Sequence, residues 1–349
     1  STRSSRNLAD GFHADLIQVL QPIHTLWPRE ENSRMKAMVI NRYGPPEVLE
    51  YATLERPVPK EDELLVKVRA TSVNPVECAI RRGELKLLVR LKFPAVLGVD
   101  VSGEVVEMGQ AVSDFRVGDA VYAFIALPRS GGYAEYAVVR AAWAGRKPAN
   151  LSDAEAAVVP GVGLTALQAL RDRARLQTGQ RVLINGGAGG VGTFAIQIAR
   201  ALGARVTAVC SAPNVDLVRR LGAERVIDYV REDFAKDRDC YDVILDCVGN
   251  RTFWTYRRML RTGGIHVAIT PTPKQFLFSK LSMLTPGKVS QVFLVQPDGK
   301  DLEFLRGLIE AGQVRPVIDR TYTLPQMAEA HRYIETKRAT GKVAVTVTV

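Results

Sequence analysis

The stretch "INGGAGGVGTFAIQIA", residues 184–199, decides the fold. Gly187, Gly189 and Gly192 have the spacing G-x-G-x-x-G, which is typical of a loop that holds the pyrophosphate of a dinucleotide. The apolar "RVLIN" before it indicates a buried strand, and "TFAIQIARAL" after it has the apolar spacing of a helix. Strand, loop and helix in this order predict the first βαβ unit of a dinucleotide-binding sheet, and a glycine-rich turn without a ligand is the less favoured interpretation.

We expect the three glycines of this loop to have different tasks. One allows a tight turn, one lets the backbone approach the pyrophosphate, and one lets the helix pack closely against the strand. The free N–H groups and the positive dipole end of the helix would then face the phosphates. The loop residues expected to contact the cofactor are Gly187, Ala188, Gly189, Gly190, Val191 and Gly192.

The strand that follows the loop indicates which nucleotide is bound. NAD-binding sheets usually place Asp or Glu about 20 residues after the first glycine, bonded to the ribose 2′-hydroxyl. The corresponding stretch "VTAVCSAPN", residues 206–214, offers Ser211 and Asn214 but no carboxylate. A hydroxyl, an amide and a nearby cation can hold a 2′-phosphate, which a carboxylate would repel; Arg219 is a candidate cation, although a solvated helix residue is its simpler interpretation. We therefore expect NADPH rather than NADH.

The predicted secondary structure changes along the chain. From Met35 to about residue 150, short strand-like segments are broken by Gly and Pro, which predicts a rolled antiparallel sheet or small barrel. Beyond a helical stretch around 152–176, strands alternate with helices, which predicts a parallel, doubly wound sheet. The tail after about residue 290 does not extend this alternation, and we expect it to rejoin the first domain. The fold class is therefore α/β with a second, β-rich domain.

Composition limits the classes of function. The net charge of +10 and the pI of about 9.5 fit an anionic partner, such as nucleic acid or a phosphorylated cofactor, or a solvated basic surface. The basic residues are scattered, so nucleic acid is a minor hypothesis. Four cysteines without a C-x-x-C pair fit a reducing compartment, and no apolar run reaches the roughly 18 residues that span a bilayer.

Residues 1–34 have the character of an appendage. They are Ser- and Arg-rich at first and then semi-apolar, which suits an organelle-targeting segment, but four acidic residues weigh against it. An extended N-terminus is the preferred interpretation. We expect a cytoplasmic protein, with a mitochondrial location as the alternative if this segment is a targeting signal.

Candidate ligands for a catalytic zinc are scarce. The four histidines are His13, His24, His266 and His331, and two of them lie in the appendage. Cys78 has no His-Glu pair after it, and no cysteines cluster for a structural zinc. We expect a metal-free site. Alcohol oxidation is then disfavoured, whereas reduction of an electron-poor C=C bond or a quinone needs only a hydride donor, a polarising hydrogen bond and a proton source.

Ordered motifs along the chain resemble the medium-chain dehydrogenase/reductase superfamily. They are most similar to its zinc-free quinone oxidoreductase branch, which includes the zeta-crystallin-like and reticulon-interacting reductases. The resemblance covers residues 35–349. The motifs that carry it are "RYGPPEVL", "SVNPVE", "VLGVDVSGEV", "FRVGDAVYA", "GGYAEYAVV", "KPANLSDAEAA", "GLTALQAL", "INGGAGGVGTFAIQIA", "LGAERVIDY" and "DVILDCVG".

The resemblance implies a domain division and a homodimer. A GroES-like catalytic domain would comprise residues 35–155 and 291–349, a Rossmann domain would comprise 156–290, and the cofactor would lie in the cleft between them. The dimer would form through the edge of the Rossmann sheet.

The resemblance also implies roles for individual residues. Asn74 would lie near the nicotinamide, or be a turn residue before Pro75, and Thr165 would line the nicotinamide pocket, or be a helix-start hydroxyl. Lys342 would reach the 2′-phosphate, or be a plain surface lysine. The remaining implied contacts are Ser211 and Tyr229 at the 2′-phosphate, with Asn214 where some relatives have lysine, and Val248, Gly249, Phe293 and Val295 beside the nicotinamide.

The sequence departs from some relatives where the substrate would bind. "AIRRGELKLLVRLKFP", residues 79–94, lacks the tyrosine that enoyl-thioester reductases place there as a proton donor. Tyr43 and Tyr133 are spare candidates, and water is the alternative. We expect an NADPH-dependent, zinc-independent reductase of quinones or α,β-unsaturated carbonyls. The alternatives are an enoyl-thioester reductase and, in another class, an RNA- or partner-binding protein with a vestigial cofactor site.

Overall fold

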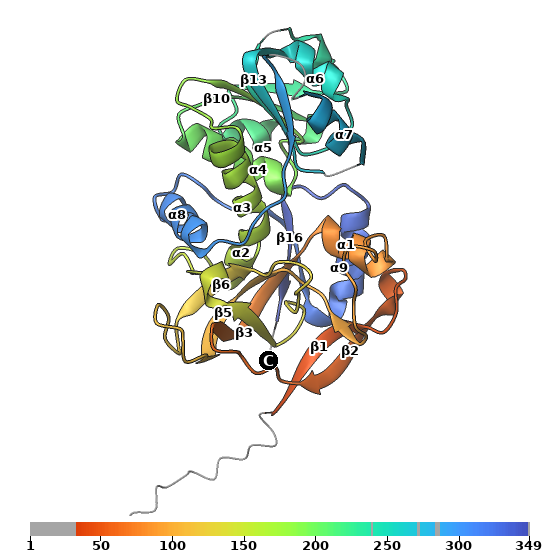
Figure 1. Ribbon diagram of the computed structural model, residues 1–349, viewed down its shortest axis with the longest axis vertical. Helices are drawn as coiled ribbons and strands as arrows, with labels where there is room; N and C mark the ends of the chain where they lie inside the picture. Colours follow the sequence, from red (N-terminus) through yellow and green to blue (C-terminus); the bar gives the residue numbers. More distant parts are fainter. Residues whose placement is uncertain (1–32, 239, 271–272, 283–286, 348–349) are drawn as a thin grey trace, which may run out of the picture.

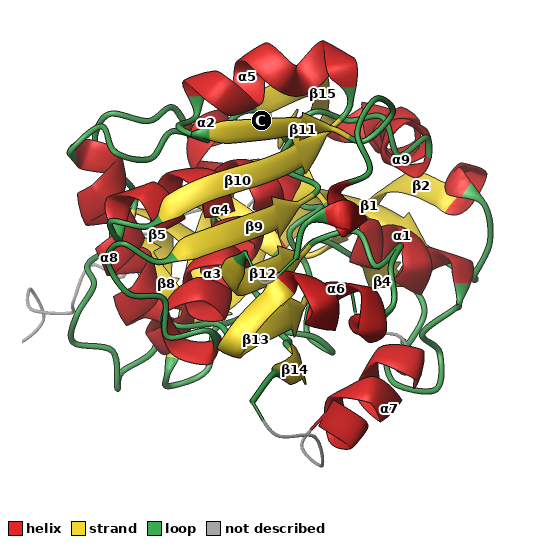
Figure 2. Cartoon of the chain, turned by 90° about the horizontal axis from the view of Figure 1, so that it is seen from above, coloured by secondary structure: helices red, strands yellow, loops and turns green. Residues whose placement is uncertain are grey.

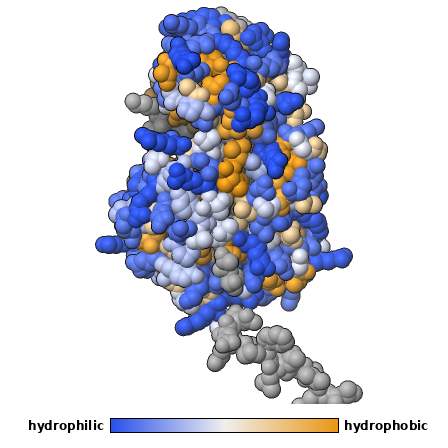
Figure 3. Space-filling model, turned by 180° about the vertical axis from the view of Figure 1, so that it is seen from behind, coloured by the Kyte–Doolittle hydropathy of each residue, from blue (hydrophilic) through white to orange (hydrophobic). Residues whose placement is uncertain are grey.

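The described part of the chain forms two lobes joined along a central waist (Figure 1). The computed structural model describes residues 33–238, 240–270, 273–282 and 287–347. One lobe is built on a parallel sheet, the other on antiparallel strands. On the face opposite to that of Figure 1, hydrophobic residues gather in separate patches between larger hydrophilic areas (Figure 3).

The parallel lobe is the predicted doubly wound sheet. Its six strands have the order β11-β10-β9-β12-β13-β14, and every neighbouring pair is parallel. Helices lie on both sides of the strands (Figure 2). The strands are β9 (Arg181–Asn185), β10 (Arg205–Cys210), β11 (Arg225–Asp228), β12 (Tyr241–Asp246), β13 (Leu260–Ala268) and β14 (Val289–Val292). The helices are α4 (Gly190–Ala201), α5 (Val215–Arg220), α6 (Phe253–Met259) and α7 (Pro273–Ser282).

Alternation along β9 explains why both faces of this sheet are covered. Val182 and Ile184 belong to a core that includes Phe194 of α4. Leu183 belongs to a second core with Tyr256 of α6. Successive strand residues point to opposite faces, so a strand that is apolar throughout requires a helix on each side.

The β-rich lobe has two sheets. The larger has the order β15-β16-β3-β5-β6-β8, with β7 also paired to β3, and the smaller has the order β2-β1-β4. All pairings are antiparallel except that of β15 with β16. The strands are β1 (Arg34–Ile40), β2 (Leu49–Glu55), β3 (Glu63–Val73), β4 (Ala95–Val96), β5 (Asp100–Met108), β6 (Ala120–Phe124), β7 (Tyr136–Arg140), β8 (Ala144–Arg146), β15 (Ile318–Thr323) and β16 (Lys342–Thr346).

The remaining helices lie in or beside the β-rich lobe and at the waist (Figure 1). Tyr122 of β6 and Leu305 of α8 share one core with Phe194 of α4, so the hydrophobic interior is continuous across the waist. These helices are α1 (Pro75–Arg82), α2 (Asp153–Ala157), α3 (Pro160–Gln168), α8 (Gly299–Glu310) and α9 (Met327–Glu335). A π-helical turn, Ala169–Arg173, extends α3, and short 3-10 turns are Pro46–Val48, Ala141–Trp143, Ala212–Asn214, Phe234–Lys236 and Leu324–Gln326.

The chain returns to the β-rich lobe later than the expected boundary at residue 290. That boundary falls within β14, which pairs in parallel with β13 and so belongs to the six-strand sheet. The return is completed by β15 and β16, which join the larger sheet of the β-rich lobe.

Among the described residues, no helix is long and apolar enough to cross a membrane.

Candidate functional site

The glycine loop between β9 and α4 has the close backbone contacts that a dinucleotide loop needs. Gly186 has φ of +88°, a conformation that favours glycine, so it makes the tight turn ahead of the expected three glycines. A Cβ atom on Gly192 would lie 2.1 Å from the carbonyl oxygen of Gly186, so only glycine allows this packing. A Cβ on Gly189 would meet nothing closer than 3.5 Å, which leaves the surface of the loop open at that point.

The N-terminus of α4 is available to an anion. Gly189 is the N-cap residue and offers no side-chain cap. The first N–H groups of a helix have no partner within it, and the helix dipole places partial positive charge there. The expected contacts Ala188, Gly190 and Val191 all lie at this end, and Ala188 accepts a hydrogen bond from the N–H of Gly341 at 2.8 Å. The loop therefore fits a pyrophosphate group.

Ser211 and Asn214 lie together at the end of β10, joined by a third residue. The Thr340 hydroxyl donates to Asn214 Oδ1 at 3.1 Å, and Asn214 Nδ2 donates to Ser211 Oγ at 3.2 Å. Because Ser211 Oγ accepts from the amide, its own hydrogen stays available for donation to an acceptor. The direction of these two hydrogen bonds suits a phosphate beside Ser211. None of the three residues that they join has a carboxylate.

Tyr229 and Arg219 lie on the elements next to these hydrogen-bonded residues. The N–H of Tyr229 donates to the carbonyl of Cys210, which brings it beside Ser211 at the ends of two adjacent parallel strands. The Tyr229 side chain is exposed. Arg219 forms an ion pair with Asp216 at 3.1 Å on the exposed face of α5, as its simpler interpretation predicts.

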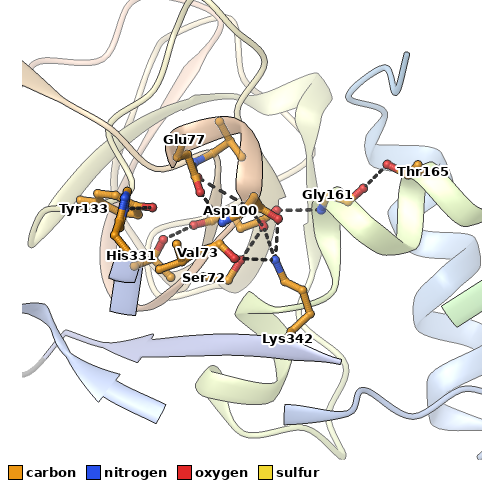
Figure 4. A network of polar contacts seen from close by, with 12 residues as sticks. Ser72, Val73, Glu77, Asp100, Tyr133, Gly161, Thr165, His331 and Lys342 are labelled. Carbon is orange, nitrogen blue, oxygen red and sulfur yellow. Dashed lines mark hydrogen bonds and ion pairs between the residues drawn. The ribbon is translucent and has the colours of Figure 1, made fainter. Parts of the chain in front are cut away.

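Lys342 does not lie where the resemblance placed it. The residue is only 3% exposed, and Nζ donates to Asn74 Oδ1 at 2.5 Å and to the carbonyl of Val73 at 3.3 Å. Nζ also lies 3.7 Å from Asp100 Oδ2. The ammonium group is thus directed into a buried polar network, away from the solvated surface (Figure 4). The physical reason is that buried carboxylates require a nearby cation.

Asp100 is the centre of this network. Its Oδ2 accepts from Ser72 Oγ at 2.6 Å and from Asn74 Nδ2 at 2.9 Å, and its Oδ1 accepts from the N–H of Gly161 at 2.7 Å. Gly161 lies in the first turn of α3, so the carboxylate also meets the positive end of that helix. Asp100 therefore ties β3 and β5 to the helix that leads into the parallel lobe.

Glu77 is the second buried carboxyl group. It accepts from the N–H of Asn74 at 2.5 Å and from the N–H of Val99 at 2.8 Å. Burial, followed by the nearby charge of Asp100, raises the pKa of Glu77 to about 7. Burial also lowers the pKa of Lys342. The site thus holds three ionisable groups in the interior, and the carboxyl of Glu77 titrates near neutral pH.

The amide of Asn74 has a fixed orientation. The ammonium group of Lys342 can only donate, so Oδ1 must face the lysine, which turns Nδ2 towards the aspartate. The second N–H of Nδ2 has only a long contact of 3.5 Å to Glu77 Oε1. That hydrogen is the part of the network that can serve another acceptor.

Thr165 lies one helical turn after Gly161, the residue at which the polar network reaches α3 (Figure 4). Its hydroxyl donates to the Gly161 carbonyl at 2.6 Å, one helical turn back, which leaves its lone pairs as acceptors. This local bond agrees with the interpretation of Thr165 as a helix hydroxyl and is compatible with the half-buried position of a pocket residue.

The other residues expected beside the nicotinamide follow β12 and β14. The N–H groups of Val248 and Gly249 both donate to Asp246 Oδ1, at 3.1 and 3.0 Å, so these donors are already used. The N–H of Phe293 donates to the Ala268 carbonyl, and its ring is buried in the core. Val295 is partly buried against the same core.

The spare tyrosines and the candidate zinc ligands have other partners. Tyr133 is fully buried, and its hydroxyl lies 3.1 Å from Nε2 of His331, whose Nδ1 lies 3.4 Å from Sγ of Cys78. Burial raises the pKa of Cys78 to about 12 and lowers that of His331 to about 3, so both are neutral near pH 7. The ring of Tyr43 packs on Phe93. Within the described ranges, no three His, Cys, Asp or Glu residues form a group that could hold a metal ion.

Gly186, Glu77, Asp100 and Thr340 are among the residues of the site that were not anticipated from the sequence. Two of them carry a recognisable signal. Glu77 stands three residues after Asn74, where a glutamate can bond back to the backbone of the N-cap. Asp100 interrupts the apolar run "VLGVDV", and a lone acid in a buried strand requires partners. Thr340 has no such signal.

Comparisons with known proteins agree with this architecture. Residues 60–149 match the family described as alcohol dehydrogenase GroES-like domain, and residues 221–345 match the family described as zinc-binding dehydrogenase. The chain is 36% identical over 322 residues to the chloroplast envelope quinone oxidoreductase homolog of Arabidopsis thaliana, covering 89% of this chain and 98% of the relative. It is 36% identical over 365 residues to the human protein named NAD(P)H oxidoreductase RTN4IP1, mitochondrial, covering 93% and 92%.

A solved structure shares the whole fold. The quinone oxidoreductase from Coxiella burnetii matches with a TM-score of 0.82 at 33% identity, covering 90% of this chain and all of that one. The similarity therefore includes both lobes as well as the glycine loop. The chain belongs to the medium-chain dehydrogenase/reductase superfamily, in its quinone oxidoreductase-like branch.

Proposed function

We propose that this chain is an NADPH-dependent reductase that transfers hydride to a quinone or an α,β-unsaturated carbonyl compound without a catalytic zinc ion. The observation that carries the proposal is the position of Lys342. Its stem packs on the glycine loop, since a Cβ on Gly190 would lie 3.0 Å from Lys342 Cδ, while its ammonium group fixes the Asn74 amide. One side chain thus joins a loop that fits a dinucleotide to a polar amide that fits a carbonyl oxygen.

The preference for NADPH is supported by the donor chain Thr340–Asn214–Ser211. Ser211 can donate to the 2′-phosphate, and Tyr229 lies beside it at the end of the next strand. The human relative is named as an NAD(P)H oxidoreductase, which is compatible with this choice. Thr340 supports this donor chain by its hydrogen bond to Asn214.

The proposed chemistry uses the second N–H of Asn74 Nδ2, which makes only the long contact to Glu77 Oε1. Bound NADPH supplies the hydride. As the hydride adds to the acceptor, negative charge grows on a carbonyl oxygen, and a fixed amide N–H stabilises that charge because it needs no reorientation. Water supplies the proton, since Tyr133 is fully buried and paired with His331. One hydride and one proton together convert a quinone to a hydroquinone, or a C=C bond to a saturated one.

Hydrogen bonds, instead of a zinc ion, would stabilise the negative charge that develops on the carbonyl oxygen. Cys78, the cysteine nearest to Asn74 in sequence, contacts His331 and is neutral because burial raises its pKa. Among the described residues, Cys78 belongs to no group of three His, Cys, Asp or Glu residues that could hold a metal ion. Thr165, Val248, Gly249, Phe293 and Val295 complete the proposed nicotinamide pocket.

Three expectations about the whole protein stay predictions. A homodimer would use β14, which lies at one edge of the six-strand sheet. A cytoplasmic location, with mitochondria as the alternative, depends on residues 1–34, of which 1–32 lie outside the described part of the chain. Nucleic acid is not an expected partner.

The test is NADPH consumption with a panel of quinones, enones and enoyl thioesters, repeated with NADH. We expect turnover with quinones or enones, little with thioesters, and no loss after treatment with a chelator. Turnover that requires zinc would refute the metal-free proposal, and preference for thioesters would favour an enoyl-thioester reductase. Salt-dependent RNA binding without any thermal shift by NADPH would favour the binding-protein alternative.

A further inference from the structure

The segment directly after α1 has an unusual surface. It has the sequence "ELKLLVRLKFP", residues 84–94, and is called the 84–94 segment below. Leu87 and Leu88 are adjacent and 86% and 81% exposed, and Phe93 is 40% exposed. Single exposed apolar residues are ordinary on protein surfaces, but three in one short segment indicate a surface that something covers.

The backbone of this segment is held in place, so the leucines are presented by a folded structure. Val89 is buried in the core of the β-rich lobe, with Leu85 and Leu91 packed against that core. The N–H groups of Leu88 and Val89 both donate to the Leu85 carbonyl, at 2.9 and 2.8 Å. Three apolar side chains anchor the segment, and the turn between them projects Leu87 and Leu88 into solvent.

Cations surround the exposed leucines. Lys86, Arg90 and Lys92 are exposed, and within the described residues none of them forms an ion pair, whereas Glu84 is paired with Arg82. Arg90 and Lys92 line a hollow that Lys60 and the 77% exposed Val58 also line. The acid of that hollow, Glu63, is paired with Arg129. The surface is therefore apolar at its tip and positively charged around it.

We propose that the 84–94 segment docks this protein on a membrane surface that contains anionic lipids. Apolar side chains that enter the boundary of headgroups and acyl chains, together with lysine and arginine at headgroup level, are the pattern of interfacial binding. Each such cation near an anionic bilayer strengthens the attachment. The charge pattern favours a lipid surface over nucleic acid, because phosphates alone give no reason for adjacent leucines at the tip.

Docking through the 84–94 segment would bring the membrane near the proposed substrate site. Asn74 is the N-cap of α1, and α1 ends at Arg82, where the segment follows (Figure 1). Eight helical residues span about 12 Å. A bilayer against the segment would therefore lie close to the proposed substrate site. This last point rests on the proposed function, whereas the docking itself does not.

The experiment measures co-sedimentation of the full chain with vesicles of phosphatidylcholine alone or with phosphatidylglycerol added. We expect binding to the anionic vesicles that weakens as salt increases. Leu87→Ser with Leu88→Ser, and separately Lys86→Ala with Lys92→Ala, should each reduce the partition coefficient at least fivefold. The matched control is Arg116→Ala with Val117→Ser, an exposed cation and an exposed apolar residue on another loop, which should bind as the wild type does.

Three outcomes would overturn the proposal, and each differs from failure of the proposed function. The first is no binding to anionic vesicles by a chain that still consumes NADPH. The second is equal binding by the wild type and both variants. The third is a dimer that dissociates in the Leu87→Ser, Leu88→Ser variant, measured by sedimentation velocity, which would assign the segment to a second copy of the chain. Thermal unfolding of each variant checks that it is folded.

Discussion

Lys342 Nζ lies 2.5 Å from Asn74 Oδ1, so a residue of β16 determines how an amide at the start of α1 is oriented. The same lysine packs its stem against Gly190 at the start of α4. Three elements from distant parts of the sequence therefore meet at one side chain. The consequences can be measured.

Removal of the Lys342 charge should destabilise the fold. Lys342→Met leaves the carboxyl groups of Asp100 and Glu77 buried without their cation, and breaking a buried ion pair costs about 3–5 kcal/mol. We expect the free energy of unfolding in urea to fall by that amount. In the double variant with Asp100→Asn the loss should be smaller than the sum of the two single losses. Additive losses would show that the two residues are not coupled.

Replacement of Asn74 should affect the chemical step more than cofactor binding. Asn74→Ala removes the fixed N–H that is proposed to stabilise the carbonyl oxygen, and loss of one such donor costs roughly 10²-fold in kcat. The KM for NADPH should change little. Asn41→Ala, which removes an exposed asparagine bonded to Glu50, is the control and should be silent. An increase in KM with unchanged kcat would assign Asn74 to binding instead.

A carboxylate at Ser211 should reverse the choice of cofactor. Ser211→Asp places negative charge at the end of the donor chain from Thr340, where it repels a 2′-phosphate and can accept from a ribose hydroxyl. We expect the Kd for NADPH to rise about 10- to 100-fold, and the Kd for NADH to stay the same or fall. Fluorescence titration with both cofactors gives these constants. Equal weakening of both would indicate damage to the loop, and no change would refute the assignment of Ser211.

Glu77 should make the stability of the protein depend on pH. Its pKa is about 7 in the folded chain and near its usual 4.5 when unfolded, so between these values the folded state holds a proton that the unfolded state releases. The free energy of unfolding must then fall as pH rises from about 4.5 to about 7. Glu77→Gln cannot titrate and should flatten this fall by about 1–3 kcal/mol.

Urea unfolding at several pH values tests the assignment to Glu77. Glu61→Gln, on an exposed turn, is the matched control and should leave the profile unchanged. Parallel profiles for the wild type and Glu77→Gln would show that another group is responsible.

The local parts of this site could be predicted from the sequence. The strand, loop and helix around Gly187 follow from apolar periodicity and glycine spacing, and Ser211 and Asn214 follow because the end of the second strand must lie beside the nucleotide. Even there, one detail escaped, since the positive φ falls on Gly186 and not on one of the three spaced glycines.

The long-range parts could not be predicted. The stretch "ATGKVAV" contains nothing that distinguishes a buried lysine from a surface lysine; only the pairing of β16 with β3 brings Lys342 to Val73 and Asn74. The same holds for Thr340, which meets Asn214 across 126 positions. The place near residue 290 where the chain leaves the parallel sheet is also hard to predict, because a short strand such as β14 does not reveal from its own sequence which sheet it joins.

The late position of β16 has a consequence for synthesis of the protein. Asp100 and Glu77 are translated long before Lys342, and at about 5–20 residues per second the intervening chain takes roughly 10–50 s to emerge from the ribosome. During that interval the last residues of β3, Ala70–Val73, lack the strand that pairs with them on one side. The parallel lobe, whose strands are all translated by then, can form first. We expect the β-rich lobe of the nascent chain to remain a substrate for chaperones until its last strand is made.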